Sequence, residues 1–214
     1  MDSSHNLVAV FPLGTVLLPG MPLPLHIFEP RYRTMMEEVL AGLPLAIFSI
    51  EEGQEALGSL ARPAHTGTLI RLDSVEKLND GRMNLLVTGT HRLRWQELVS
   101  EDPFLKARLS VWEDEDAGQN EKEKRRLAVA LHSELSDYLA LLQVKTRVEL
   151  PEEPELICHL CIQNSGLPLP RRQAFLEIPT LQERMERTLR MMQRKNLLIR
   201  SSPGPGIQQG ESLN

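Results

Sequence analysis

Three polar side chains lie close together near the N-terminus, beside the start of a helical pattern. They are His26, Glu29 and Arg31, in the stretch HIFEPRY. A histidine beside a carboxylate could move a proton, and the arginine could bind the carboxylate of a peptide. The same residues could instead cap the helix that begins at Pro30 and tie it to a neighbouring strand. Spacing alone leaves both interpretations open.

A second motif with chemical potential is CHLC, which contains Cys158 and Cys161, the two cysteines of the chain. A C-x-x-C pair can be redox-active or can bind zinc. A structural zinc site needs four ligands, however, and neither His159 nor His132 completes a known spacing. The pair reads better as part of the buried stripe of a helix. We therefore expect reduced thiols, no metal and no cofactor.

Three arginines, Arg82, Arg92 and Arg94, could form a basic face that binds RNA. The formal net charge of -5 and the 4% of aromatic residues argue against this, because RNA binding usually needs positive potential and stacking platforms. Asp80 and Glu97 also interrupt the basic pattern. The charges then read as the solvated face of a strand. We therefore expect no nucleic-acid partner, and RNA binding is kept only as an alternative.

The methionines allow two interpretations. Flexible thioethers suit a groove that accepts varied apolar side chains, but methionines at helical spacing are also typical of a core. The two groups fall in the opening segment and in the last helical pattern, at Met21, Met35, Met36, Met185, Met191 and Met192.

The elements that must position these residues change character along the chain. Residues 7–112 contain short runs typical of strands, and residues after 120 follow a helical period. The strand-like runs are LVAVF, PLAIFSI, LLVTG and HRLRWQEL. Asn79, Asp80 and Gly81 between two such runs predict a hairpin, because these residues tolerate positive φ.

Four prolines interrupt the apolar segment that precedes the first helix: Pro12, Pro19, Pro22 and Pro24. They predict a strand, a tight turn at Pro19-Gly20 and an extended edge segment, since proline cannot donate to a ladder. A helix should then run from Pro30 towards Gly42. Its apolar face is expected to carry Tyr32, Met35, Met36, Val39 and Leu40.

The second half predicts four helices. The acidic segment 113–120 is expected to separate the lobes, because it is polar and contains little that a core could hold. Asn120 with Glu123, and Thr180 with Glu183, form possible capping boxes. The predicted helices follow Asn120, span 154–164 before Gly166, span 170–177, and run from 180 to 200.

Targeting and catalytic motifs are missing from the sequence. It has no apolar run of 18 residues, no basic n-region and no A-x-A site, so we expect a cytoplasmic protein without membrane contact. It also lacks G-x-x-x-x-G-K-[ST], so no phosphate-binding loop is expected.

Four segments, in order, carry a family resemblance. FPLGTVLLPGMPLPLHIFEPRYRTMM is similar to the signature of the Lon N-terminal (substrate-binding) domain. DGRMNLLVTGTHRLRW, DPFLKARLSVWED and PLPRRQAFLEIPTLQERMERTLRMM resemble later segments of the same family. The resemblance covers about residues 7–197.

The resemblance implies an α+β fold with an N-terminal PUA-like β pseudo-barrel lobe, which contains one main helix, followed by a C-terminal helical bundle lobe. The expected boundaries are 1–114 for the β lobe, 115–200 for the helical lobe and 201–214 for a disordered tail.

The resemblance also implies a non-enzymatic protein that binds unfolded or apolar protein segments and cooperates with a protease or chaperone as an adaptor or holdase. The ATPase and peptidase modules of the full protease, with its serine–lysine dyad, have no counterpart. A structural or assembly role is the alternative. The predicted peptide- or partner-binding surface contains Met21, His26, Glu29, Arg31, Met35, Arg92, Met185 and Met192.

Overall fold

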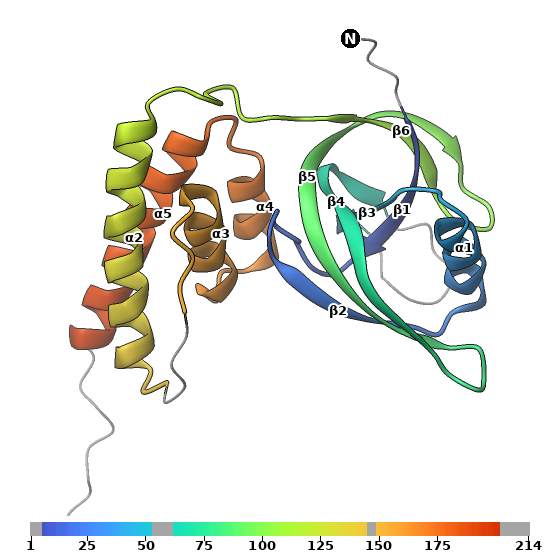
Figure 1. Ribbon diagram of the computed structural model, residues 1–214, viewed down its shortest axis with the longest axis horizontal. Coiled ribbons are helices and arrows are strands. Elements are labelled where there is room, and N and C mark those ends of the chain that lie inside the picture. Colours follow the sequence, from blue (N-terminus) through green and yellow to red (C-terminus); the bar gives the residue numbers. More distant parts are fainter. Residues whose placement is uncertain (1–5, 53–61, 145–148, 202–214) are drawn as a thin grey trace, which may run out of the picture.

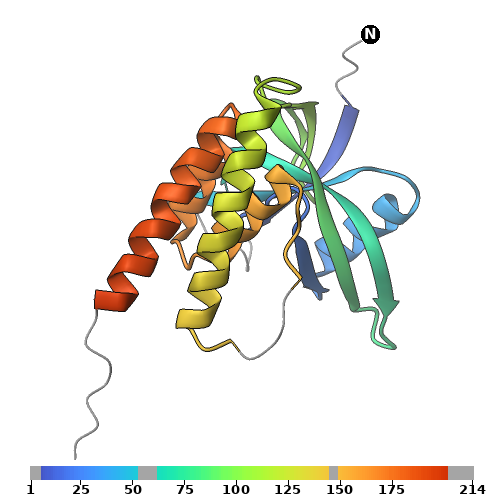
Figure 2. The ribbon, with the colours of Figure 1, turned by 60° about the vertical axis from the view of Figure 1, so that its left-hand side comes forward.

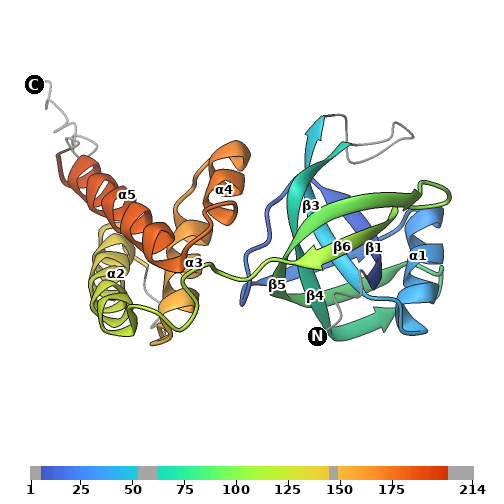
Figure 3. The same ribbon diagram turned by 90° about the horizontal axis from the view of Figure 1, so that it is seen from above.

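The computed structural model describes residues 6–52, 62–144 and 149–201. A β lobe and a helical lobe lie side by side, and an extended segment after the last strand joins them (Figures 1 and 3). The mixed α+β class predicted from the sequence is confirmed, with six strands in one sheet and five helices in the described ranges. The likeness to PUA-like pseudo-barrels stays a prediction. The predicted tail falls almost wholly on 202–214, outside the described residues.

The sheet nearly closes on itself. Its strands follow the order β2-β5-β4-β3-β1-β6, and an additional pairing of β5 with β6 closes a ring from which only β2 projects as an edge. β1 and β3 are parallel, and the other pairs are antiparallel. The strands are β1 (Asn6–Leu13), β2 (Pro22–Ile27), β3 (Leu45–Glu52), β4 (Arg62–Lys77), β5 (Met83–Ser100) and β6 (Lys106–Val111).

The predicted hairpin joins β4 to β5, and Gly81 adopts a φ of 82° in its turn. The sequence predicts two runs, LLVTG and HRLRWQEL, where the structure has one long strand, β5. Gly89 ends the first run, and the strand continues through it past Leu18, whose carbonyl oxygen would lie 2.7 Å from any Cβ at this position. The glycine therefore allows a close crossing of two segments and does not end the strand.

The opening segment follows the prediction closely. The Met21 N–H donates to the Leu18 carbonyl across the Pro19-Gly20 turn, and Gly20 takes a φ of 77°. β2 then pairs with β5 alone, as an edge strand. Pro22 and Pro24 are two residues apart and remove donors from one edge of β2, which protects that edge from strand addition.

Helix α1 (Pro30–Leu40) also begins and ends where the sequence predicts. Tyr32, Met35, Met36 and Val39 are buried, but Leu40 is exposed, because it lies one position past the buried stripe. α1 packs at one end of the β lobe (Figure 1).

Four helices form the second lobe, and α2 lies alongside α5 (Figures 1 and 2). Their positions agree with the prediction: α2 (Glu121–Leu141), α3 (Pro154–Asn164), α4 (Leu169–Leu176) and α5 (Leu181–Ser201).

The capping boxes agree only in part. Thr180 accepts the Glu183 N–H at 3.3 Å, as expected. Asn120, in contrast, takes a left-handed φ of 53° and makes no side-chain cap, so the capping box proposed for α2 is wrong. Its amide donates instead to Gln182 on α5.

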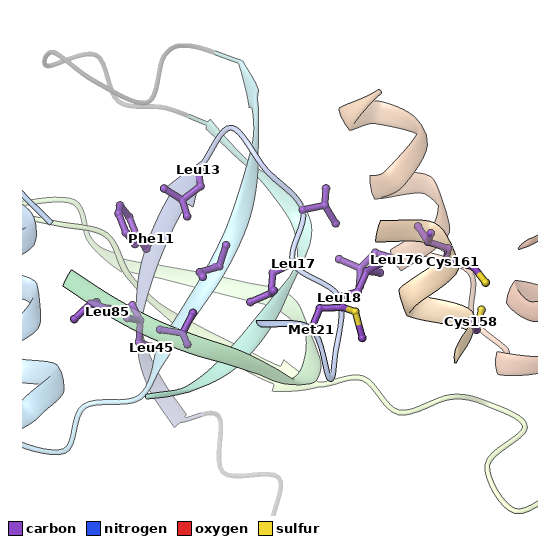
Figure 4. Close-up of a cluster of buried hydrophobic side chains, with 14 of the residues drawn as sticks. Phe11, Leu13, Leu17, Leu18, Met21, Leu45, Leu85, Cys158, Cys161 and Leu176 are labelled. Atoms are coloured by element: carbon purple, nitrogen blue, oxygen red, sulfur yellow. The ribbon is translucent and has the colours of Figure 1, made fainter. Parts of the chain in front are cut away.

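A single large core cluster runs through both lobes. Figure 4 shows Leu17, Leu18 and Met21 of the β lobe close to Leu176 and Cys161 of the helical lobe. Val8 and Val10 of β1, with Ala46 and Phe48 of β3, belong to a separate, smaller cluster. The shared cluster fixes the two lobes against each other through apolar contact. The boundary near residue 114 stays a prediction.

Candidate functional site

The polar group near the start of α1 does not converge on one point. His26 is exposed, and its Nδ1 lies 2.7 Å from Oδ1 of Asn84 on β5. Arg31 pairs with Glu29 at 3.0 Å. Glu29 occupies the N-cap position of α1 but makes no side-chain cap bond. These contacts join β2 to β5 and Arg31 to Glu29, so His26 and Glu29 do not form the acid–base pair.

The methionines of the predicted binding surface belong to the core. Met21 is 5% exposed, and Met35, Met185 and Met192 are fully buried. The sequence is compatible with methionines in a core or in a binding groove. In the structure these thioethers pack against other apolar side chains. In this conformation they offer no surface to a peptide.

Arg92 does not form a basic face with Arg82 and Arg94. Its guanidinium is buried and donates to the carbonyl oxygens of Leu176 and Ile178 at 2.9 and 2.8 Å. Arg82 lies elsewhere, exposed and paired with Asp80. The expectation of a solvated strand face fails at Arg92, because the helical lobe covers this part of β5.

Arg92 belongs to a group that we call the lobe junction: Arg92, Trp112, Asp114 and Arg184. Asp114 Oδ1 accepts hydrogen bonds from both arginines. The Trp112 ring stacks on Arg92 at 4.2 Å and on Arg94 at 3.4 Å. Burial, with the charge of Arg184, lowers the pKa of Arg92 to about 10, although Asp114 opposes this shift. Arg92 therefore stays charged near neutral pH, and its hydrogen bonds to Leu176, Ile178 and Asp114 connect the lobes.

The acidic linker also takes part in the structure. Asp116 is 7% exposed and accepts the N–H groups of Leu181 and Gln182, which caps α5. Burial raises the pKa of Asp116, but these two hydrogen bonds and Lys124 outweigh it, so its pKa lies below the usual value. The sequence predicts a polar segment over 113–120 that contains little for a core to hold, but Asp116 is buried, because a carboxylate at a helix N-terminus can be buried.

His159, between the two cysteines, is a structural histidine that the sequence did not single out. It is fully buried, and its Nδ1–H donates to the Pro19 carbonyl at 2.9 Å. Burial, with the charge of Arg184, lowers its pKa to about 3. Because Pro19 is 140 residues away, no local pattern could have indicated this contact.

The cysteines are inert packing residues. Cys158 and Cys161 are both buried and unpaired. Burial raises the pKa of Cys158 to about 11 and raises that of Cys161 further. Thiols of this kind are not activated nucleophiles or metal ligands. Within 6–52, 62–144 and 149–201, no group of three or more histidine, cysteine or acidic residues could hold a metal ion.

The accessible candidate site is a cavity of about 410 Å³ in the β lobe, which we call the β-lobe cavity. Its apolar lining comes from Trp95 and Leu98 on β5, Pro63 and Ala64 on β4, and Leu105 before β6. Leu105 belongs to the smaller core cluster, and Trp95 packs against that cluster. Trp95 is fixed by an edge-to-face contact with Phe48, with ring centroids 5.7 Å apart.

The remaining lining of the β-lobe cavity is polar. It consists of Glu51, Arg62, His65 and Glu101. Arg62 lies 3.7 Å from Glu52, and both side chains are more than two-thirds exposed. An apolar floor with a charged rim is typical of a binding site. Since this floor continues a packed cluster, its shape is largely preformed.

The sequence contains a weak signal for this site. The alternation of apolar residues at Leu93 and Trp95 should continue at Glu97, but the next apolar residue is Leu98. The pairing of β5 with β6 shifts its register between Trp95 and Glu97, which turns Leu98 towards the cavity. A β-bulge often redirects a side chain in this way.

Two other hollows are weaker candidates. One, of about 350 Å³, lies at the lobe junction, where Arg92, Asp114 and Lys124 already have partners. The other, of about 850 Å³, lies beside α2 and includes Val129 and Pro154, but its lining among the described residues contains no tryptophan, tyrosine or phenylalanine. Aromatic anchors contribute strongly to protein recognition, so we favour the β-lobe cavity.

None of the helices within the described ranges is long and apolar enough to cross a membrane.

Comparisons with known proteins agree with this architecture. The model of the "ATP-dependent protease La (LON) substrate-binding domain" family matches residues 8–194. Lon protease 2 of Myxococcus xanthus is 26% identical over 204 residues, which cover 92% of this chain and 24% of that protein. Lon protease of Anaeromyxobacter dehalogenans is 24% identical over 94% of this chain and 25% of its own. The chain thus spans about a quarter of the length of these relatives.

Two solved structures share the fold. The Lon N-terminal domain protein from Xanthomonas campestris superimposes with a TM-score of 0.63 at 24% identity, covering 86% of this chain and 98% of that one. The N-terminal domain of the Mycobacterium avium complex Lon protease gives a TM-score of 0.66 at 18% identity, covering 88% and 98%.

Proposed function

The chain belongs to the family of ATP-dependent protease La (LON) substrate-binding domains, and we propose that it binds exposed apolar segments of other proteins without catalysing a reaction. Family membership supports a role in recognising protein substrates. The choice of apolar segments is our inference from the β-lobe cavity. In the cytoplasm, such a domain would act as an adaptor or holdase that presents its ligand to a protease or chaperone.

The observation that carries this proposal is the accessible apolar floor of the β-lobe cavity. Trp95 and Leu98 reach solvent there, and Leu98 is 42% exposed. The volume of about 410 Å³ can accept one or two large side chains of a peptide. A short segment buries little area and loses conformational entropy on binding, so we expect dissociation constants in the micromolar range or weaker.

The absence of catalysis is proposed on the state of the candidate nucleophiles and bases. Both cysteines are buried with raised pKa values, and His159 is buried with a lowered one. His26, the histidine of the predicted acid–base group, contacts Asn84 and not Glu29. None of these groups is arranged for proton transfer or nucleophilic attack.

RNA binding has little support in the arrangement of the arginines. Arg92 is buried, and Arg94 lies against Trp112. Arg82 is paired with Asp80. These three side chains offer no common surface to a phosphate backbone, which would need several accessible cations.

Binding of a labelled peptide provides the test. A peptide of leucine, phenylalanine, serine and glycine should raise its fluorescence anisotropy on titration with the protein, with little dependence on salt. Leu98→Asp should abolish the signal, because it places a charge on the apolar floor. Val129→Asp is the matched control, since Val129 is 73% exposed on α2, away from the β-lobe cavity.

Equal binding by wild type and Leu98→Asp would move recognition to another surface. No binding of any apolar peptide would favour a structural or assembly role. Binding of a single-stranded RNA that weakens steeply with salt would instead support the nucleic-acid alternative.

A further inference from the structure

We propose that the β-lobe cavity selects protein segments in which an apolar side chain has a lysine or arginine close by in the sequence. This inference rests on the proposed function and names its substrate class. The apolar side chain would sit on the floor of the cavity, and the basic group would pair with carboxylates on the rim.

The apolar floor of the cavity accounts for the preference for an apolar side chain. Trp95, Leu98 and Leu105 offer apolar surface, and Leu105 is only 8% exposed because it lies at the inner end. A ligand side chain that covers this surface removes it from water, which favours aliphatic and aromatic groups. A wholly polar segment would leave the apolar floor in contact with water, so it would gain no binding free energy there.

The carboxylates on the rim of the cavity account for the preference for a neighbouring lysine or arginine. Glu51 and Glu101 line the cavity from two different parts of the β lobe, at the end of β3 and after β5. Glu52 and Asp102, the next residue in each case, are also exposed. Four carboxylates therefore stand at this edge of the β lobe.

Positive charge at the rim neutralises only part of the negative charge of these four carboxylates. Among the residues that the structure describes, Arg62 is the one arginine or lysine in the cavity lining, and it lies 3.7 Å from Glu52. Glu51 and Glu101 have no ion-pair partner within the residues that the structure describes. Two glutamates against one arginine make the rim negative, so it attracts a basic side chain and repels an acidic one.

Geometry makes both contacts compatible in one short segment. A cavity of about 410 Å³ holds the floor and both glutamates within the span of a few residues. Lysine and arginine suit this place, because their aliphatic stems can lie along apolar surface while the charged group reaches the rim. An extended segment that alternates apolar and basic residues therefore matches the site.

Three peptides with one apolar centre test the proposal. The centre Leu-Phe-Leu is flanked by lysines, by serines or by glutamates, and each peptide is titrated against the full chain. In a Trp112→Phe background, Trp95 is the remaining tryptophan and reports directly on the cavity. Anisotropy of labelled peptides on the wild-type chain provides the second measurement, in case this variant folds poorly.

We expect affinity to fall in the order lysine, serine, glutamate at low salt. An exposed ion pair changes affinity by roughly threefold, so the lysine and glutamate peptides should differ by about tenfold. The difference should shrink towards unity at about 1 M salt, where screening acts over about 3 Å.

The Glu51→Gln, Glu101→Gln double variant should bind all three peptides alike. A Glu37→Gln, Glu152→Gln double variant is the matched control, because it changes the net charge equally at two exposed glutamates outside the cavity. It should keep the preference for lysine.

Each contrary outcome has a defined meaning. Equal affinity of the three peptides overturns the proposed specificity and leaves the proposed function standing. A preference for lysine that survives Glu51→Gln, Glu101→Gln also overturns it, because the preference then comes from the overall charge. A lysine peptide with a Gly-Ser-Gly centre that binds as well would make this a cation site without apolar selection. Failure of all peptides to bind contradicts the proposed function itself.

Discussion

The lobe junction and the β-lobe cavity contain the same kinds of residue and use them in opposite ways. Each contains a tryptophan, an arginine and acidic side chains. At the lobe junction these are Trp112, Arg92 and Asp114. At the β-lobe cavity they are Trp95, Arg62, Glu51 and Glu101. Arg92 is 3% exposed, whereas the Arg62 side chain is 69% exposed. The difference shows that burial, and not residue type, decides whether such a group holds a fold together or faces a ligand.

The physical reason lies in the dielectric environment. At the junction, removal of one partner leaves a charge that can neither be solvated nor paired, so each partner depends on the others. At the cavity rim, water solvates every charge, and an ion pair contributes little to stability. The junction charges therefore fix the arrangement of the lobes, and the rim charges are available to a ligand.

Asp114→Ala should produce the largest effect, because it leaves Arg92 and Arg184 without their shared carboxylate. We expect the free energy of unfolding to fall by about 4 kcal/mol in urea denaturation. Asp137→Ala is the matched control, since it removes an exposed partner of Arg200 and should cost below about 1 kcal/mol. Equal losses from the two variants would contradict the contrast between buried and exposed ion pairs.

Met35→Ala should come next, with a loss of about 3 kcal/mol, because it opens a space in the fully buried part of the core. Peptide affinity of the folded protein should stay unchanged. Urea denaturation and anisotropy measure the two quantities separately. Weaker peptide binding without loss of stability would instead return this methionine to a binding groove.

A pH effect should distinguish the interior from the cavity rim. The pKa of His159 falls from an ordinary value near 6.5 to about 3 in the folded chain. Below pH 6.5 the unfolded chain binds a proton that the folded chain does not, so stability falls as pH falls towards 3. Between pH 7 and pH 5 the free energy of unfolding should drop by about 2 kcal/mol.

His159→Asn should remove most of this drop, because asparagine can still donate to the Pro19 carbonyl but does not titrate. His132→Asn, at an exposed position on α2, should leave it unchanged. Urea denaturation of each variant at both pH values gives the comparison. A pH dependence in His159→Asn as large as in wild type would assign the effect to other groups.

Arg62→Gln should have the smallest effect, because its pairing with Glu52 is exposed. The free energy of unfolding should change by less than about 0.5 kcal/mol. Affinity for lysine-flanked peptides should rise slightly, since the rim becomes more negative. A stability loss comparable to that of Asp114→Ala would show that the rim is structural after all.

Most elements of this fold follow from local sequence signals. α1 begins at Pro30, α3 ends before Gly166, and the hairpin turns at Gly81, because proline and glycine act through their own backbone preferences. The buried face of each helix follows from the spacing of its apolar residues, because side chains three and four positions apart lie on one side of a helix. Family membership also follows from the order of the quoted motifs.

The predicted binding surface could not be placed in this way. The same pattern of methionines suits a core or a groove, and only the packing of α1 and α5 buries them. Arg92 reads as a solvated residue of a strand until α4 and the segment after it cover its side chain. Such contacts join residues more than 80 positions apart, and no local spacing encodes them.

The sequence by itself thus determined the order of the helices and most of their limits, since these depend on neighbouring residues. The tertiary structure alone decided which charges are buried and which are exposed, because burial depends on segments far away in the chain. Asp116 and Glu101 are both carboxylates in acidic, polar stretches. Asp116 caps α5 and is buried, whereas Glu101 lines the β-lobe cavity, because different elements pack beside them.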